Sequence, residues 1–370
     1  MTVSILYREE LKEYDFGPGH PFRGDRYEIF PKMLRKHVRE DGNYRIVAAD
    51  TCTEDDLRLI CSQEYIDFCT GYFRAANRGE VFAGSMDFPR YQSLDNLPRG
   101  RPGKLEEAAR IAIGQAKKAT ALVVEDREEI VICIGGNLHH AKPNYGEGFC
   151  IYNDNAFAAK YLLEHYGLKR VMVLDTDAHH GNGTCEYFYT DPRVLFVDLH
   201  QDPSTLYPGI GFANDIGQGE GKGFTINVPM PVYAGLDSYR LAFEQVVEPV
   251  AREFKPEVII RNGGSDPHFA DGLTNLGLPI EGFKMIGERM RSLVAECGCA
   301  EIDIIGSGYN IEVLPSAWLA LVSGLAGFGV EVEEPVPVPQ QFVQDLVADD
   351  TAKVVQRVRG YLKDYWKCFR

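Results

Sequence analysis

Short apolar runs alternate with helical patterns along this chain of 370 residues. The runs are nearly continuous in Val, Ile and Leu, which is typical of strands that are covered on both faces. They predict strands at 45–50, 129–136, 169–178, 193–201, 224–230, 256–264 and 301–309. Apolar residues at helical spacing predict helices at 104–124, 153–166, 236–254, 281–296, 314–326 and 343–369. This alternation predicts an α/β fold with a central parallel sheet that carries helices on both faces.

No repeat or long linker divides the chain, so we predict one domain over 1–370, with a core at about 14–326 and a closing C-terminal helix at 343–369. Two segments rich in Gly, Pro and Asp, 76–103 and 201–223, are read as long loops. Loops of this length inside a domain usually carry function.

The composition limits the classes of partner. A net charge of −15 argues against non-specific nucleic-acid binding. The same charge would steer a cationic substrate, although solubility alone also explains it. No apolar run reaches the roughly 18 residues of a membrane span, and the charged start shows no secretory signal. We therefore expect a cytoplasmic protein without membrane contact.

The nine cysteines include no CxxC pair, and an odd number of them favours reduced thiols over a disulfide framework. Cys297 and Cys299 are read as a helix end followed by a turn, because two thiols supply too few ligands for a zinc site.

Unusual polar side chains follow five of the predicted strands. In chain order they are His139 and His140; Asp175, Asp177, His179 and His180; Asp198 and His200; Asp266, His268 and Asp271; and Tyr309. Ligands of parallel α/β sheets bind beyond the carboxyl ends of the strands. Five such ends at one edge of a sheet therefore predict a functional site.

Three of these residues could share one metal ion. Asp177 and His179 are two residues apart, so they point the same way in an extended segment. Asp266 from another strand end could be the third ligand. Two aspartates and one histidine with an open position are typical of catalytic zinc, although Fe(II) would also fit. The alternative is a set of hydrogen-bonded polar residues without a metal.

Asp175 lies on the same face as Asp177, but as a fourth ligand it would close the site. We expect it instead to orient a histidine of a neighbouring strand end. If one of His139 and His140 pairs with Asp175 and the other with Asn182, the two imidazoles differ in pKa. Such a pair supplies a base and an acid from two like residues.

The remaining polar residues receive simpler interpretations. His180 is expected to be a structural hydrogen-bonding residue, and Gly181 and Gly183 to allow a tight turn. Tyr309 would donate a hydrogen bond to a developing oxyanion, with a packing role as the alternative. The glycines beside Ser307 would let the backbone come close to a ligand.

Six segments together resemble the histone deacetylase superfamily, the deacetylase branch of the arginase/deacetylase fold. They are "YDFGPGHPFRGDR" (14–26), "IGGNLHHAKPNYGEGFCIYND" (134–154), "LDTDAHHGNGT" (174–184), "DLHQDPSTLYPGIG" (198–211), "GGSDPHFADGL" (263–273) and "GSGYN" (306–310). The similarity is strongest to class I enzymes and to acetoin-utilization-type deacetylases of bacteria and archaea.

The resemblance implies a role for each site residue. It implies one zinc ion on Asp177, His179 and Asp266, and it implies that Tyr309 polarises the acyl carbonyl. It further implies proton transfer by the tandem histidines, with His139 paired to Asp175 and His140 to Asn182.

The resemblance also implies surroundings for the substrate and a second ion. Phe149 and Tyr207 would wall an acyl-lysine tunnel, the Gly148 carbonyl would face the substrate amide, and Arg26 would line an internal cavity. The implied potassium ion would be held by the Asp175 carboxylate and by backbone carbonyls, including those of Asp177, His179 and Leu199.

Three departures from the class I pattern bear on these roles. Asn182 replaces an aspartate, which predicts that His140 is the weaker partner of the acid–base pair. Asp198 replaces a serine beside the potassium site. The segment 76–103 does not match the family closely, and the acidic residue that grips the substrate backbone at the rim is not assigned within it.

We therefore expect a zinc-dependent amidohydrolase that removes acetyl or short acyl groups from lysine side chains of proteins through metal-activated water. Deacetylation of acetylpolyamines or other small N-acetyl amines is the main alternative. A catalytically silent acyl-lysine binder and a two-manganese ureohydrolase are less favoured, because the catalytic set is intact and a second metal lacks carboxylates.

Overall fold

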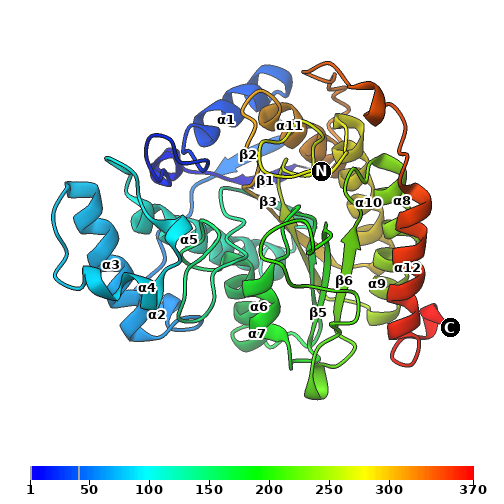
Figure 1. Cartoon of the computed structure of the whole chain (residues 1–370), viewed down its shortest axis with the longest axis horizontal. Coiled ribbons are helices and arrows are strands. Elements are labelled where there is room, and N and C mark those ends of the chain that lie inside the picture. Colours follow the sequence, from blue (N-terminus) through cyan, green and yellow to red (C-terminus); the bar gives the residue numbers. More distant parts are fainter. Residues whose placement is uncertain (1, 41) are drawn as a thin grey trace.

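The computed structural model, which describes residues 2–40 and 42–370, is built around an eight-stranded sheet (Figure 1). The strand order is β2-β1-β3-β8-β7-β4-β5-β6, and every neighbouring pair is parallel. The strands are β1 (Val3–Leu6), β2 (Tyr44–Val47), β3 (Ile130–Ile134), β4 (Val171–Asp175), β5 (Val194–Gln201), β6 (Thr225–Met230), β7 (Val258–Gly263) and β8 (Ala300–Ile305). The predicted parallel α/β fold is confirmed.

Helices cover both faces of the sheet (Figure 1). They are α1 (Arg26–His37), α2 (Glu54–Leu57), α3 (Gln63–Arg78), α4 (Phe88–Tyr91), α5 (Leu105–Val124), α6 (Asp154–Glu164), α7 (Asn182–Phe188), α8 (Leu236–Ala242), α9 (Glu248–Phe254), α10 (Ile280–Cys297), α11 (Leu314–Ala326) and α12 (Ala348–Leu362). On one side α5 packs on β3 and β8, and α6 packs on β4 and β7, with α3 outside α5. The other side carries α1, α11, α10 and α9, while α12 packs on α8 and β6.

The structure adds elements that the hydrophobic pattern did not predict. Strand β1 pairs with both β2 and β3, and helix α1 follows it in the N-terminal part. The expected helix at 236–254 is α8 and α9 joined by a π-helical segment at Phe243–Val247. The expected C-terminal helix is shorter, with α12 ending at Leu362 before a turn. The segment 76–103 contains the end of α3, helix α4 and two short helical turns, so it is not a plain loop.

A buried ion pair ties two central strands together beneath the strand ends. Arg261 of β7 and Asp303 of β8 are each 1% exposed. Arg261 donates to Asp303 through Nε at 2.7 Å and through Nη2 at 2.5 Å. Its Nη1 also donates to Thr176 Oγ1 at 3.1 Å, so the pair supports the loop that follows β4.

All nine cysteines are free thiols, and α10 ends at Cys297 with Gly298 in the left-handed conformation. The helix-end interpretation of the CxC pair is therefore confirmed. No helix in the described ranges is long and apolar enough to cross a membrane.

Candidate active site

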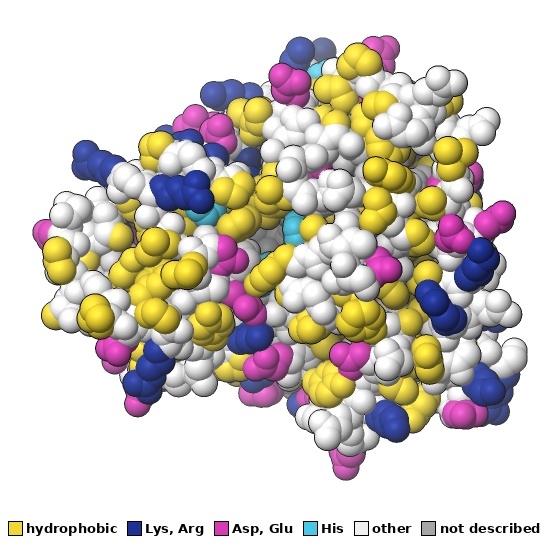
Figure 2. All heavy atoms as spheres, in the orientation of Figure 1, with side chains coloured by type: hydrophobic (Ala, Val, Ile, Leu, Met, Phe, Trp, Pro, Cys, Tyr) yellow, Lys and Arg dark blue, Asp and Glu magenta, His cyan; other side chains and the backbone are white. Residues whose placement is uncertain are grey.

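The five strands with polar ends are neighbours in the sheet. They form the contiguous run β3-β8-β7-β4-β5, so their carboxyl ends meet at one place. The molecular surface is hollowed near the centre of the face shown in Figure 2, where histidine side chains are visible among hydrophobic ones. One of the polar residues turns away, because His268 Nε2 lies 2.8 Å from Glu334 Oε1. The other strand ends converge on the buried site described below.

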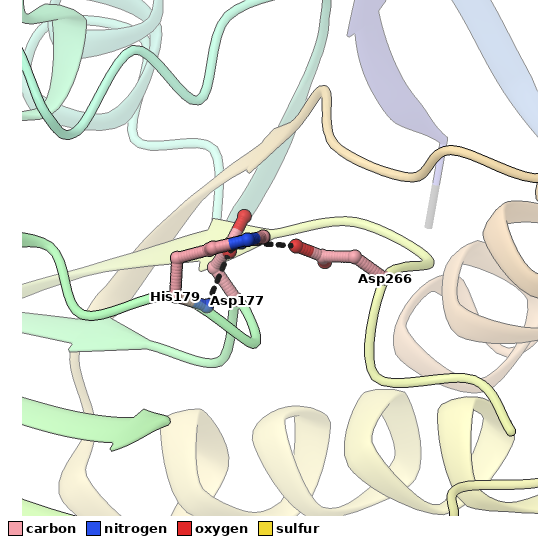
Figure 3. Close-up of side chains that lie close together, drawn as sticks. All are labelled: Asp177, His179 and Asp266. Carbon is pink, nitrogen blue, oxygen red and sulfur yellow. Dashed lines mark hydrogen bonds and ion pairs between the residues drawn. The ribbon is translucent and has the colours of Figure 1, made fainter. Parts of the chain in front are cut away.

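Asp177, His179 and Asp266 point toward one another from the ends of β4 and β7 (Figure 3). One potential ligand atom of each lies within 4.8 Å of the others. His179 Nδ1 is 3.0 Å from Asp177 Oδ1 and 3.1 Å from Asp266 Oδ2. Burial and the charge of Asp177 raise the pKa of Asp266 well above its usual value. Two buried carboxylates this close repel unless a cation lies between them, so the three residues fit a divalent metal ion.

Side chains that the sequence did not single out hold these carboxylates in place. Asn137 Nδ2 donates to Asp177 Oδ2 at 2.8 Å. Ser307 Oγ donates to Asp266 Oδ1 at 2.7 Å. Asn137 stands two residues before the tandem histidines and Ser307 two residues before Tyr309, so proximity to those motifs was the available signal. Such outer partners orient the ligands of metal sites.

The tandem histidines have the two partners that the sequence suggested. His139 Nδ1 is 2.8 Å from Asp175 Oδ2, and His140 Nδ1 is 2.6 Å from Asn182 Oδ1. The two Nε2 atoms lie 3.1 Å apart. Burial alone would lower the pKa of His139, but the charges of Asp175 and Asp177 outweigh it and raise that pKa to about 9. Burial and the charge of His139 hold the pKa of His140 well below its usual value.

Tyr309 borders the metal-binding group. Its ring centroid is 6.1 Å from that of His179. Burial and the charges of Asp177 and Asp266 raise the pKa of Tyr309 well above its usual value, so the phenol keeps its proton. Its backbone N–H donates to Asp271 Oδ2 at 2.7 Å, which fixes the end of the β8 loop. The side chain is therefore a held hydrogen-bond donor beside the metal-binding group.

The buried Arg26 lies on the far side of Tyr309. Its guanidinium carbon is 5.6 Å from the centre of the Tyr309 ring and 3.9 Å from that of Phe22. Its Nη1 donates to the Gly306 carbonyl at 2.9 Å. Arg26 is 3% exposed and thus faces the protein interior, as a cavity-lining residue would.

Aromatic residues border the mouth of the site. Phe149 lies 5.9 Å from Tyr309 between ring centroids, and Tyr207 lies 5.2 Å from His140. The Gly148 carbonyl accepts a hydrogen bond from the Cys150 thiol at 3.3 Å, and its second lone pair remains for another donor. The Gly148 N–H donates to Asp95 Oδ2 at 2.9 Å. Asp95, from the segment 76–103, was not recognised in the sequence.

Behind the site, Asp198 is already engaged by the protein. Its carboxylate accepts from the Gly181 N–H at 2.8 Å and lies 2.7 Å from His200 Nδ1. Burial and the charge of Asp175 raise the pKa of Asp198 to about 6. His180 does not make the hydrogen bonds that were expected, because neither ring nitrogen has a hydrogen-bond partner within the described residues. Its ring packs on that of His200, with 4.8 Å between the centroids.

The glycines near the site serve close packing. The expected tight turn is found at Gly181, where φ is −73°, ψ is 59° and the Asn182 N–H donates to the His180 carbonyl at 2.8 Å, as in an inverse γ-turn. Gly183 lies within α7. A Cβ on Gly181 would lie 2.5 Å from Asp175 Oδ2, and one on Gly183 would lie 2.5 Å from the Ala141 carbonyl oxygen. A side chain at 181 would therefore displace the Asp175 carboxylate, and one at 183 would displace the backbone at His140 and Ala141.

Atoms of neighbouring strand ends pack closely against the two glycines beside Ser307. A Cβ on Gly306 would lie 2.2 Å from the Gly136 carbonyl oxygen, and one on Gly308 would lie 1.9 Å from Ser265 Oγ. Neighbouring strand ends thus come close at these two positions.

Comparisons with known proteins agree with this architecture. A family model described as the histone deacetylase domain matches residues 20–325. A probable deacetylase of Archaeoglobus fulgidus is 32% identical over 383 residues, with 100% of both chains covered. The acetoin utilization protein AcuC of Staphylococcus xylosus is 32% identical over 328 residues, which cover 88% of this chain and 83% of that protein. The crystal structure of the HDA15 HD domain superposes with a TM-score of 0.81 at 24% identity, covering 100% of this chain and 97% of the other.

Fold and site define a parallel α/β protein with a buried Asp-His-Asp group at its central strand ends. The chain belongs to the histone deacetylase family. Within this family it is similar to deacetylases of the acetoin-utilization type. The resemblance inferred from the sequence motifs is confirmed. Membership places the chain among deacetylases, which are hydrolases.

Proposed function

We propose that the protein is a metal-dependent deacylase that hydrolyses acetyl or short acyl amides of lysine side chains in proteins. The observation that carries this proposal is the convergence of Asp177, His179 and Asp266 with the tandem histidines at the ends of adjacent strands. Tyr309 borders the same group, so a potential metal site, a proton-transfer pair and an oxyanion donor share one hollow.

Asp177, His179 and Asp266 would hold one zinc ion, with Fe(II) as the other fitting ion. A divalent ion bound there supplies a Lewis acid that polarises an acyl carbonyl and lowers the pKa of water. Support comes from the repulsion between two buried carboxylates, which a cation relieves. A potassium ion beside Asp175 is proposed on similar grounds, because Asp198 brings a second buried carboxylate there.

The protein's own groups would move the protons. His139 and His140 share the 3.1 Å contact between their Nε2 atoms, so a proton taken from water by one can pass to the other. Asp175 stabilises the positive charge on His139, while Asn182 holds His140 without adding charge. The Tyr309 hydroxyl would donate to the oxygen that becomes negative during hydrolysis.

Phe149 and Tyr207 would wall the acyl-lysine tunnel, with the Gly148 carbonyl as acceptor for the substrate amide and Arg26 lining the interior cavity. Asp95 suits the role of the acidic rim residue. Its Oδ2 accepts from Gly148, while its buried Oδ1 has no partner within the described residues and could accept from a substrate backbone. Action in the cytoplasm on acetylated proteins is part of this proposal.

The test is a panel of acyl-lysine peptides, acetylputrescine and acetylspermidine, assayed with Zn(II), with Fe(II) and after chelation. We expect kcat/KM to be highest for acetyl-lysine peptides and to fall by at least about 100-fold on chelation. Higher kcat/KM on the acetylpolyamines would replace the protein-lysine substrate with a small amine. No amide hydrolysis on any substrate with either metal would refute the proposed function.

A further inference from the structure

The Asn182 side chain lies between His140 and a second acidic residue. Its Oδ1 is 2.6 Å from His140 Nδ1, and its Nδ2 donates to Glu147 Oε1 at 2.7 Å. Asn182 is 4% exposed. The amide therefore links a buried imidazole to a carboxylate that belongs to the loop after β3.

The chemistry of the carboxylate determines which way the amide faces. An ionised carboxylate only accepts hydrogen bonds, so Glu147 requires the NH2 group of Asn182. The amide oxygen must then face His140 Nδ1, and that nitrogen must carry the proton. The Nε2 atom of His140 is left with its lone pair, directed at the neighbouring His139. Without Glu147, an amide turned by 180° would present its NH2 group and favour the opposite tautomer.

Glu147 is itself held in place by an ion pair. Lys142 Nζ lies 3.0 Å from Glu147 Oε1, and the Glu147 side chain is 15% exposed. Lys142 also reaches Glu186 Oε2 at 3.7 Å, where the carboxylate is 53% exposed. Within the described residues, the Asn182 side chain donates to Glu147 and not to Glu186. Glu186 thus offers a matched carboxylate on the same lysine that lies outside the proposed link.

We propose that Glu147 is a positioning residue that acts through Asn182 to fix His140 in the tautomer with the proton on Nδ1. In this chain the Glu147–Asn182 pair does what one directly bonded carboxylate would do, since both present an oxygen to His140 Nδ1. The inference rests on the proposed function for its catalytic consequence, but its structural content stands on the hydrogen bonds alone.

The first experiment compares Glu147→Gln with Glu186→Gln. A glutamine at 147 both donates and accepts, so it no longer dictates the orientation of Asn182. We expect Glu147→Gln to lower kcat about 10–100-fold with little change in KM, as loss of an outer partner does. Glu186→Gln should keep kcat within about twofold, because exposed ion pairs contribute little. Equal kcat values for the two variants would overturn the proposal.

The second experiment is a rescue. In the double variant Glu147→Gln/Asn182→Asp, the new carboxylate presents oxygen to His140 in either orientation, so Glu147 is no longer required. We expect the double variant to recover at least about tenfold in kcat over Glu147→Gln, a coupling that separates orientation from general damage to the loop. A double variant no better than Glu147→Gln would count against the link.

A third measurement is independent of catalysis. Nitrogen-15 spectra of histidine-labelled protein report the tautomer of His140, whose signals are identified by their absence in His140→Ala. We expect the Nδ1–H form in the wild type and in Glu186→Gln, and a mixture in Glu147→Gln. An unchanged tautomer in Glu147→Gln would overturn the proposal even if no acyl amide is hydrolysed, whereas an inactive wild type with the expected spectra would refute only the proposed function.

Discussion

At the residue scale, the two tandem histidines differ because their partners differ. His139 faces the charged Asp175, whereas His140 faces the neutral amide of Asn182. The pKa of His139 is raised to about 9 and that of His140 is held low, so the pair contains one imidazole that keeps a proton and one that stays neutral. Asn182 and its hydrogen-bond partner Glu147 thus influence the difference in pKa between the two histidines.

Tyr309 gives the residue-scale prediction. Replacement by Phe removes the hydroxyl donor while keeping the ring that packs near His179 and Phe149. We expect Tyr309→Phe to lower kcat by about 10²–10³, the usual cost of one oxyanion donor. Metal content and melting temperature should stay close to wild type.

Tyr361→Phe is the matched control for this prediction, because Tyr361 lies on α12 and is 49% exposed. Its kcat should equal that of the wild type. Near-normal turnover by Tyr309→Phe would remove the tyrosine from the mechanism and leave oxyanion stabilisation to other groups.

At the element scale, the apolar runs were enough to predict seven of the eight strands, and their polar ends marked where the site lies. Strand β1 is only Val3–Leu6, and the polar Ser4 interrupts its short apolar run. Helix α1 carries Pro31 inside the helix, which argues against a helix when sequence alone is read. The order of the strands places the five strands with polar ends side by side. This order depends on tertiary packing and was available only from the structure.

The sequence also could not reveal contacts between distant loops. Glu147 and Asn182 are 35 residues apart, and the motif around each residue does not predict its contact with the other. Asp95 reaches Gly148 across 53 residues from a segment that does not match the family pattern closely. Both contacts arise from how loops fold over the strand ends, which local periodicity does not encode.

The buried pair Arg261–Asp303 gives the element-scale prediction. Asp303→Ala would leave the Arg261 charge buried without its partner, so we expect the free energy of unfolding to fall by about 3–5 kcal/mol in urea denaturation. The apolar double variant Arg261→Met/Asp303→Leu should recover most of that loss. As a surface control, Arg193→Ala breaks the exposed pair with Asp191 and should cost less than about 1 kcal/mol. A loss for Asp303→Ala no larger than that of Arg193→Ala would contradict this account.

At the scale of the whole molecule, one sheet supports one candidate active site. Within the described residues, Asp177, His179 and Asp266 are the group of three or more ligand-type side chains close enough to hold a metal ion. A two-metal ureohydrolase needs further carboxylates beside this group, whereas Gly181 and Asn182 follow the β4 motif. The architecture therefore favours one divalent ion per chain and hydrolysis at one hollow.

The most direct test of this account is a titration of metal-free protein with Zn(II), in which bound metal and released acetate are measured on the same samples. We predict that hydrolysis of an acetyl-lysine peptide is absent before metal is added, rises in proportion to bound zinc and saturates at one equivalent per chain. Asp266→Ala should neither retain the ion nor release acetate under the same conditions. Full activity in the metal-free protein, or saturation at two equivalents, would contradict the account.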